Sequence, residues 1–512
     1  MGHTGDLTKL RSEFPLTENI RSTNTSYRNA SLLLTSKADT TPVYQEHSAL
    51  DQRFSCQSVN DGEQVELTCD VLTHLLPLFG PKMVLQQFGD HIQRGMRHPN
   101  EKVRVLIMKQ ILSSVEGEDG MTEVCQNVPL LLSIIAALGD SSLGVVKYTN
   151  KALVRVSSSG RTGLNAVFSS EGITVMQEAM SKSDSCRFNV YEFVVSVCLV
   201  GDEALGVVSN CGLLERLVAE VTVTGDILTQ LNALELLVPL ATSPSGLRLL
   251  NEGGVIAKLQ YLLSLAETDP MATMLLPGLI KFFGNLGNCS PSQLYEEYGS
   301  VLLMVLRLAS GRLDLNDPGL HLTAIDTIAY IGETPQGKFT LGKCKTELDE
   351  VLDAIGTRIR TAPTDQRVSV LEALSRLFYL PVESQTDDLV GLTEIWWSSV
   401  GGVSMEKIIA VSRQPFPELH CAALTFINVL ASLPWGQRLI NAEPGLVEYI
   451  LDRSSESDKE GKELKHLIVT TLIHSPYSET ILGEDYMKKL TKFYNEGPFY
   501  VEANPEVAFA GE

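Results

Sequence analysis

A helical segment with a centre of small and branched apolar residues recurs along most of the chain. Eight segments carry the pattern: Met108–Leu112, Lys151–Val156, Glu192–Val197, Asn232–Leu237, Lys281–Leu286, Thr323–Ile328, Glu372–Leu377 and Cys421–Ile427. Successive centres lie roughly 40–50 residues apart, which is the period of repeats built from two or three helices. Such a repeat cannot bury its apolar face alone, so neighbouring repeats stack. The repetition predicts an all-α fold, a HEAT/armadillo-like α-solenoid wound as a right-handed superhelix, in which successive second helices form a long concave groove.

A glycine-bounded segment follows several of these centres. The clear copies are Gly163–Ile173, Gly246–Ile256 and Gly436–Leu446, and a weaker copy is Leu205–Leu214. Each copy predicts a short helix closed by glycine at its C-cap, and then a new helix that begins on an aliphatic residue. Polar or proline residues typical of helix starts precede many centres. They are Pro99–Glu101, Asp140–Ser142, Asp184–Ser185, Pro363–Asp365 and Pro417–Glu418.

Apolar periodicity also favours helices and divides the chain. Leu464, Leu467, Ile468 and Leu472 follow the spacing of one helix face, and no segment alternates convincingly at period two. Residues 1–60 are instead rich in Ser and Thr, and we expect them to be disordered at least to about residue 50 because they lack periodic apolar positions. We therefore expect an N-terminal tail over 1–60, a repeat region over 61–495 and a C-terminal tail over 496–512.

The chain is strongly acidic. Lys and Arg number 41 and Asp and Glu number 62, which gives a formal net charge of −21. Phosphate contacts need clustered basic residues, so this balance argues against nucleic acid and against an anionic membrane surface. It fits a basic protein partner, and it also fits solubility alone. The excess of acidic residues falls on the chain from about Asp61 onward.

The cysteines and the apolar runs bear on where the protein resides. Nine cysteines lie scattered with no Cys-x-x-Cys pair, as expected of reduced intracellular thiols. No basic stretch followed by an apolar run marks a secretory signal. Apolar runs such as Val128–Leu138 are far shorter than the roughly 20 residues that span a bilayer. We expect a soluble cytoplasmic protein without membrane contact, and leave a nuclear location open.

One stretch matches the spacing of a phosphate-binding loop. Gly332 to Lys338 follow the Gly-x4-Gly-Lys pattern, but Phe339 stands where Ser or Thr must hold magnesium. The stretch also follows a helix, whereas such a loop follows a buried strand. We therefore interpret it as the glycine turn of a repeat. Its counterparts are Gly163, Gly246 and Gly436.

His420 and Cys421 are adjacent and suggest a nucleophile or a metal site. Cys421 falls at the small, buried centre of its helix, and His420 has no acidic or His partner at ligand spacing. The acidic residues are dispersed, so no carboxylate pair stands out for acid–base catalysis. We expect a structural role for His420 and Cys421, and no catalytic, metal-binding or cofactor-binding residue in the chain.

Two aromatic pairs are candidates for contact with a partner. Adjacent helical residues point about 100° apart, so the rings of Trp396 and Trp397 cannot sink equally into one core. One ring could line the groove or a repeat junction, but burial of both rings in the core is the favoured expectation. Phe282 and Phe283 raise the same question. Because aromatic side chains are enriched at binding hot spots, both pairs are candidates for an interface.

Six long blocks resemble a known family. They are Pro277–Leu286, Tyr379–Leu389, Gln414–Leu424, Pro434–Leu439, Gly445–Ser454 and Asn495–Val501. They closely resemble the 26S proteasome non-ATPase regulatory subunit 5 family, whose members are HEAT/armadillo-like assembly chaperones for the base of the proteasome's regulatory particle. The likeness covers Gln64 to Val501, whereas residues 1–50 do not match the leucine-rich helical segment that opens the family.

The resemblance implies partners and a mechanism. Family members bind the C-terminal domain of one ring ATPase, regulatory subunit 7, in an early module with regulatory subunit 4 and non-ATPase subunit 2. They leave before the particle matures, and we expect such a chaperone to be a monomer when free and to mask the ATPase face that later docks on the proteolytic core. Candidate interface residues, taken from the matching blocks and the aromatic pairs, are Phe282, Phe283, Asn285, Trp396, Pro417, Glu418 and His420.

Two other functions are compatible with the sequence. The first is a general armadillo-type adaptor for transport or scaffolding. Import receptors of that kind carry regular Trp and Asn positions on each third helix, whereas this chain has three Trp, two of them adjacent. The second is an enzyme, for which the stretch around Lys338 is the one candidate site.

Overall fold

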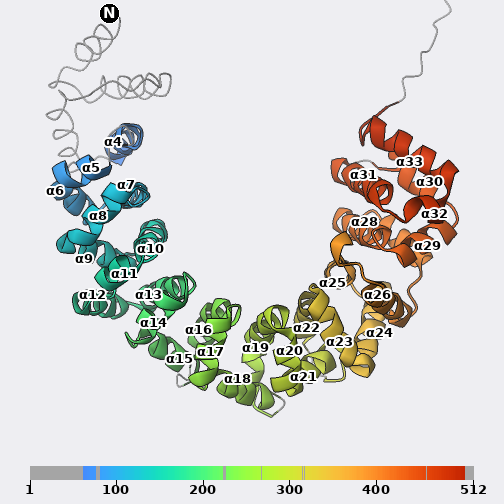
Figure 1. Cartoon of the computed structure of the whole chain (residues 1–512), viewed down its shortest axis with the longest axis horizontal. Helices are drawn as coiled ribbons and strands as arrows, with labels where there is room; N and C mark the ends of the chain where they lie inside the picture. Colours follow the sequence, from blue (N-terminus) through green and yellow to red (C-terminus); the bar gives the residue numbers. More distant parts are fainter. Residues whose placement is uncertain are drawn as a thin grey trace, which may run out of the picture. The chain divides into compact units, whose positions relative to one another are not determined.

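The computed structural model describes residues 62–76, 81–222, 226–266, 268–313, 315, 317–456 and 458–501. These ranges contain thirty α-helices, α4 to α33, three short 3-10 helices and no strand (Figure 1). The all-α prediction is therefore confirmed. The expected tail over 1–60 lies outside the described residues, as do residues 502–512 of the expected C-terminal tail. The predicted boundaries of the repeat region stay a prediction.

The helices fall into repeats of three. After α4 (Gly62–Leu75), the first helices are α5 (Pro81–Gln87), α8 (Glu118–Gln126), α11 (Arg161–Val167), α14 (Asp202–Ser209), α17 (Pro244–Glu252), α20 (Pro291–Glu297), α23 (Pro335–Lys343), α26 (Asp387–Ser399), α29 (Pro434–Ala442) and α32 (Ser478–Leu482). The second helices are α6 (Gly89–Met96), α9 (Val128–Ala136), α12 (Ser170–Met180), α15 (Leu213–Thr222), α18 (Val255–Ser264), α21 (Gly299–Ser310), α24 (Lys345–Thr361), α27 (Met405–Ser412), α30 (Leu446–Leu451) and α33 (Glu484–Glu496). The third helices are α7 (Glu101–Ser114), α10 (Leu143–Ser157), α13 (Asp184–Cys198), α16 (Ile227–Ala241), α19 (Pro270–Cys289), α22 (Pro318–Ile331), α25 (Thr364–Phe378), α28 (Pro417–Ala431) and α31 (Lys459–His474). The 3-10 helices are η3 (Ala137–Gly139), η4 (Val382–Ser384) and η5 (Arg453–Ser455).

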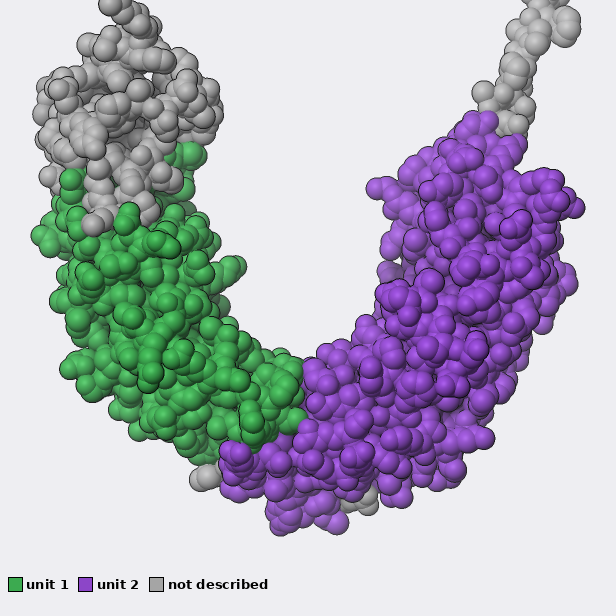
Figure 2. Space-filling model, in the orientation of Figure 1, with its two compact units in different colours: residues 1–249 green, residues 250–512 purple. Residues whose placement is uncertain are grey.

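The third helices carry all eight predicted centres. They begin 41 to 53 residues apart, so the structure decides in favour of three helices per repeat. The chain divides into two compact units, Met1–Leu249 and Leu250–Glu512 (Figure 2). In the first unit α7, α10, α13 and α16 stack in a row, and in the second α19, α22, α25, α28 and α31 do the same (Figure 1). The third helices, which carry the centres, thus form a continuous row in each unit, whereas the repeat pattern predicted a binding surface made by second helices.

Small residues allow the third helices to stack closely. A Cβ atom on Gly284 of α19 would lie 2.6 Å from Cγ2 of Thr327 on α22. Ala152 of α10, Ala324 of α22 and Ala423 of α28 are small, buried residues of other third helices. Because interiors are close-packed, a larger residue at Gly284 would force these two helices apart.

The glycines predicted to close the short helices are confirmed in part. Gly212, Gly254 and Gly445 have positive φ and directly precede α15, α18 and α30, whereas Gly172 lies inside α12, which begins at Ser170.

Other glycines make the turns from the third helices into the first helices. Four glycines lie in the first turn of a first helix, against the last carbonyl groups of the preceding third helix. A Cβ atom at Gly163, Gly246, Gly337 or Gly436 would lie 2.0, 2.4, 1.7 or 2.1 Å from the carbonyl oxygen of Val156, Leu240, Ile331 or Leu430. Only glycine lets the chain turn this sharply between the two helices.

The predicted helix starts are confirmed in part. Asn100 caps α7, where its side chain accepts a hydrogen bond from Lys102 N at 2.8 Å. For α13 the cap is Ser183, one residue before the predicted Asp184. Asp140 binds the guanidinium of Arg104 with both carboxylate oxygens, at 2.8 and 2.9 Å, and so ties α7 to the start of α10.

No single helix in the described ranges has both the length and the apolar composition to cross a bilayer. Two pairs, α8 with α9–η3 and α28 with α29, reach that composition only when joined across bends of 91° and 116°.

Candidate functional site

Three of the candidate interface residues are core residues. Phe282 and Phe283 of α19 are 0% and 1% exposed, and their rings pack edge to face at 5.4 Å. Trp396 of α26 is 3% exposed. These side chains have no surface for a partner to contact, which corrects their nomination as interface residues.

The tryptophans form an aromatic cluster inside the second unit. Phe378 lies at the centre, with ring centroids of Trp396, Trp397, Phe426 and Trp435 at 5.9 to 6.5 Å. Trp397 is half-buried and also packs against Phe426 and Trp435. The pair therefore fills a junction between repeats rather than a surface.

The remaining candidates are better placed for contact. Asn285 is half-buried on α19, where its side chain donates to Lys281 O at 2.8 Å. Pro417 and Glu418 are exposed in the first turn of α28. His420, one helical turn further along α28, is buried. It belongs to a cluster of charged side chains that the sequence did not predict.

A pocket of about 710 Å³ lies beside the start of α28. Its walls come from the turn between α27 and α28, from α30, and from the segment Asp452–Asp458 that leads into α31. Four acidic residues line it: Glu448, Asp452, Glu456 and Asp458. Among the described residues that line it, Arg413 is the one lysine or arginine, so the pocket favours cationic ligands.

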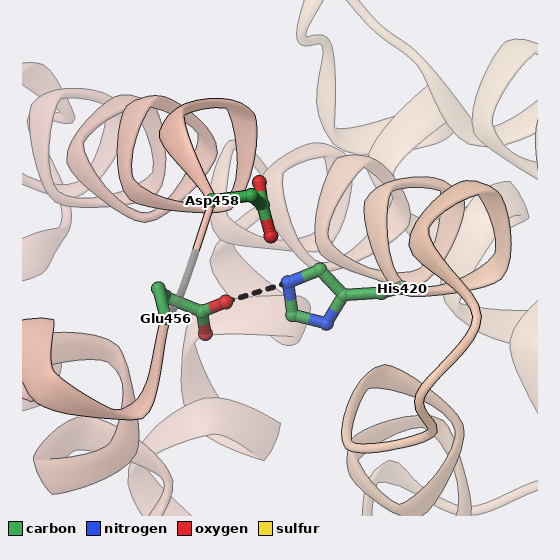
Figure 3. A group of neighbouring side chains, drawn as sticks. All are labelled: His420, Glu456 and Asp458. Atoms are coloured by element: carbon green, nitrogen blue, oxygen red, sulfur yellow. Dashed lines mark ion pairs between the residues drawn. The ribbon is translucent and has the colours of Figure 1, made fainter.

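His420 lines this pocket. Its side chain extends from α28 toward Glu456 (Figure 3). Its Nε2 atom lies 2.8 Å from Oε2 of Glu456, and its Nδ1 atom contacts the carbonyl oxygen of Ser412. Both acceptors are satisfied together when both ring nitrogens carry protons. The hydrogen bond to Glu456 raises the pKa of His420, although burial acts to lower it.

Lys465 of α31 holds the other side of Glu456. Its Nζ atom lies 2.7 Å from Oε1 of Glu456 and also donates to Tyr449 O, Asp452 O and Ser455 Oγ at 2.7, 3.1 and 2.6 Å. Burial lowers the pKa of Lys465, while Glu456 acts to raise it. Burial acts to raise the pKa of Glu456. The hydrogen bonds from His420 and Lys465 outweigh this effect, so the pKa of Glu456 is lowered. Glu456 is thus a buried carboxylate between two cationic partners.

Tyr449 of α30 lies between two cations. The Nζ atom of Lys465 is 3.7 Å from its ring centroid, and the guanidinium carbon of Arg413 is 4.7 Å from it. Cation–π attraction of this kind fixes the tyrosine in the wall of the pocket.

Cys421, the neighbour of His420, is only partly buried, which corrects the expectation of a buried centre. Burial raises the pKa of its thiol to about 11, so it is protonated at neutral pH.

Three side chains of the pocket could hold a metal ion. One ligand atom each from His420, Glu456 and Asp458 lies within 4.8 Å of the others. Sequence spacing did not reveal the acidic partners because α29 and α30 separate them from His420 along the chain. The one usable signal was the repeat length, which brings the loop before α31 next to the start of α28.

The phosphate-loop interpretation of Gly332–Phe339 is wrong, and the glycine-turn interpretation is confirmed. Lys338 lies inside α23 and is fully buried, and its Nζ atom donates to Gly332 O. Burial lowers the pKa of Lys338 to about 7. Phe339 is exposed on the same helix. The lysine therefore caps the carboxyl end of α22 instead of facing a ligand.

Solved structures support the fold. Kap121p bound to Pho4p, a karyopherin-type HEAT-repeat solenoid, matches with a TM-score of 0.53 and 14% identity over 93% of this chain and 46% of that chain. A Kap121p mutant matches with a TM-score of 0.50 and 13% identity, again over 46% of its length. This chain thus spans about half the length of those proteins. At this identity the likeness establishes the HEAT/armadillo-like solenoid and nothing of its function.

Sequence relatives go further than the fold. The family model described as "Proteasome non-ATPase 26S subunit" matches residues 18–512. The chain is 36% identical over 459 residues to the 26S proteasome non-ATPase regulatory subunit 5 of Bos taurus, and 35% identical to that of Homo sapiens, with 90% of each chain covered. The Drosophila melanogaster protein of the same name is 23% identical over 471 residues, with 90% of this chain and 89% of that protein covered.

The family match also revises the extent of the resemblance. It begins at residue 18 instead of Gln64, so the expected departure over residues 1–50 is wrong for residues 18–50. The relatives are named as proteasome regulatory subunits, and a proteasome-related role follows from the relationship. The chain belongs to the proteasome non-ATPase 26S subunit family, together with the 26S proteasome non-ATPase regulatory subunit 5 proteins.

Proposed function

We propose that this protein is a non-catalytic assembly chaperone for the base of the proteasome's regulatory particle. The relationship to regulatory subunit 5 proteins along 90% of the chain carries this proposal. Its partner would be the C-terminal domain of the ring ATPase regulatory subunit 7, in an early module with regulatory subunit 4 and non-ATPase subunit 2. By covering the ATPase face that docks on the proteolytic core, the protein would delay docking until it leaves. It would act in the cytoplasm as a monomer when free.

Two features of the molecule support such a role. Rows of third helices give each unit an extended surface of stacked repeats, which suits protein binding better than a small reactive pocket does. The net charge of −21 favours a basic partner. The exposed residues Pro417 and Glu418 and the half-buried Asn285 stay candidates for the interface. Pro417 lines the acidic pocket, and Glu418 is the next residue of α28.

The direct test is association of the purified full chain with the recombinant C-terminal domain of regulatory subunit 7. We expect a stable complex at micromolar concentration, and no complex with the corresponding domain of a ring ATPase outside the module. Failure of the two proteins to associate would overturn the proposal. A finding by mass spectrometry that non-proteasomal proteins dominate among those co-purifying with the chain would favour the general armadillo-type adaptor instead.

The interface can be tested separately. Glu418→Arg reverses a charge beside the pocket, and we expect it to weaken the complex at least about tenfold if the basic partner lies there. Glu215→Arg is the control, because Glu215 is an exposed acid on α15 in the other unit. Equal binding by both variants would move the interface away from α28 and leave the chaperone proposal intact.

A further inference from the structure

We propose that His420, Glu456 and Asp458 form a binding site for a divalent transition-metal ion. The three side chains converge in Figure 3, where His420 comes from α28 and the two acids come from the segment before α31. Their ligand atoms lie within 4.8 Å of one another. Ligands about 2.0–2.2 Å from a tetrahedral ion lie about 3.4 Å apart, so an ion fits among them with small side-chain adjustments.

Each of the three ligands is oriented by a second partner. His420 directs Nδ1 to the carbonyl of Ser412, which leaves Nε2 for a metal. Lys465 binds Oε1 of Glu456 at 2.7 Å, which leaves Oε2. The backbone N–H of Gly461 donates to Oδ1 of Asp458 at 2.7 Å, which fixes the direction of that carboxylate. Such outer partners fix the tautomer and the direction of metal ligands in proteins.

A glycine keeps the space among the ligands open. A Cβ atom on Gly461 would lie 2.6 Å from Oε2 of Glu456, 2.9 Å from Nε2 of His420 and 3.3 Å from Oδ1 of Asp458. Gly461 is inside α31, where alanine is the more stable choice by about 1 kcal/mol in an ordinary helix. Any side chain here would occupy the space in which the ligand atoms converge.

The chemistry of the site suits a transition metal with open coordination positions. Two carboxylates neutralise a divalent charge, and one imidazole favours a transition metal over calcium or magnesium. The site opens onto the acidic pocket, so water can complete the coordination. On binding, the metal takes the place of the proton on His420 Nε2, and that proton leaves to solvent. The bound ion would tie the start of α28 to the segment before α31.

The test uses Mn²⁺, because the nine cysteines of the chain would compete for a softer ion such as Zn²⁺. Binding of MnCl2 to the full chain is followed by the loss of the free-ion electron paramagnetic resonance signal. We expect one Mn²⁺ per chain for the wild type. Asp458→Asn should weaken binding at least about tenfold, because its amide oxygen can still cap α31 but lacks the charge.

Two further variants sharpen the result. Gly461→Ala removes no ligand and should also abolish binding, because its methyl group fills the space. Glu448→Gln removes an acid from another wall of the same pocket and should bind Mn²⁺ like the wild type. Protein and Mn²⁺ are mixed at equal concentrations, so that one bound ion per chain removes a measurable share of the free-ion signal. The proposal is overturned if the wild type removes none of this signal, or if Asp458→Asn and Gly461→Ala, shown by circular dichroism to be folded, remove as much of it as the wild type.

Discussion

The Nζ atom of Lys465 lies 2.7 Å from Oε1 of Glu456, and the two side chains are only 1% and 3% exposed. A buried ion pair of this kind is costly to desolvate, and it is stable only where further hydrogen bonds satisfy both groups. Here three other oxygen acceptors bind Lys465, and His420 binds the second oxygen of Glu456. The pair therefore locks α31 to the segment that precedes it and to α28.

Removing one partner of this pair should destabilise the second unit strongly. Lys465→Met leaves Glu456 buried with one cationic partner, and we expect the free energy of unfolding to fall by about 3–5 kcal/mol. Urea unfolding followed by tryptophan fluorescence measures this, because all three tryptophans of the chain, Trp396, Trp397 and Trp435, belong to the nearby aromatic cluster.

The same helix offers a matched control. Lys459 pairs with Glu463 at 3.4 Å, but both side chains are largely exposed. Lys459→Met should change the stability by less than about 0.5 kcal/mol. Equal effects of Lys459→Met and Lys465→Met would mean that the buried pair adds nothing beyond a surface ion pair.

Lys338 should make stability depend on pH in the alkaline range. Burial lowers its pKa to about 7, whereas the unfolded chain has a lysine pKa of about 10.4. Between these values the unfolded state binds more protons than the folded state, so the free energy of unfolding rises with pH. The destabilisation caused by burying Lys338 therefore becomes smaller as the pH rises. Below pH 7 the lysine is charged in both states and the cost is constant.

Lys338→Met should therefore stabilise the protein most near pH 7, by at most about 4 kcal/mol, and progressively less toward pH 10. The measurement is urea unfolding of the variant and the wild type at pH 7, 8.5 and 9.5. Lys345→Met, on the exposed surface of α24, should show no such trend. A difference that is flat with pH, or that grows with pH, would contradict a neutral buried lysine.

The glycine turns should tolerate no side chain. Gly337→Ala places a Cβ atom 1.7 Å from the carbonyl oxygen of Ile331, so α23 must move away from α22. We expect a loss of at least about 2 kcal/mol in unfolding free energy. Gly391→Ala is the control, because nothing lies within 4 Å of that Cβ inside α26, and it should stabilise by about 0.5–1 kcal/mol. Stabilisation by both substitutions would rule out the close approach at Gly337.

The fold could be predicted from the sequence far better than the site. Repeat centres and glycine turns depend on residues near each other in the chain, so the segment around Gly337 could be assigned by comparison with Gly163 and Gly436. The site depends on the register between α28 and a loop two helices later, which brings Glu456 to His420. Composition and spacing do not determine that register. Likewise, the depth at which Phe282 and Trp396 are buried depends on neighbouring repeats that local periodicity does not specify.

Arg453 should hold the end of α33 in place. Its guanidinium donates to Phe493 O and Gly497 O, both at 3.0 Å, and pairs with Glu496 at 3.2 Å. A lysine side chain cannot make these bonds together.

Arg453→Lys should therefore speed amide hydrogen exchange in the last turn of α33 by about 5- to 30-fold, which corresponds to a loss of about 1–2 kcal/mol. Hydrogen–deuterium exchange with mass spectrometry measures this at Gly497, whose N–H donates to Phe493 O. The control is Lys492→Met, which removes only an exposed contact to Glu496 and should leave exchange at Gly497 unchanged. Unaltered exchange in Arg453→Lys would show that packing of α33, and not this arginine, fixes the carboxyl end of the described chain.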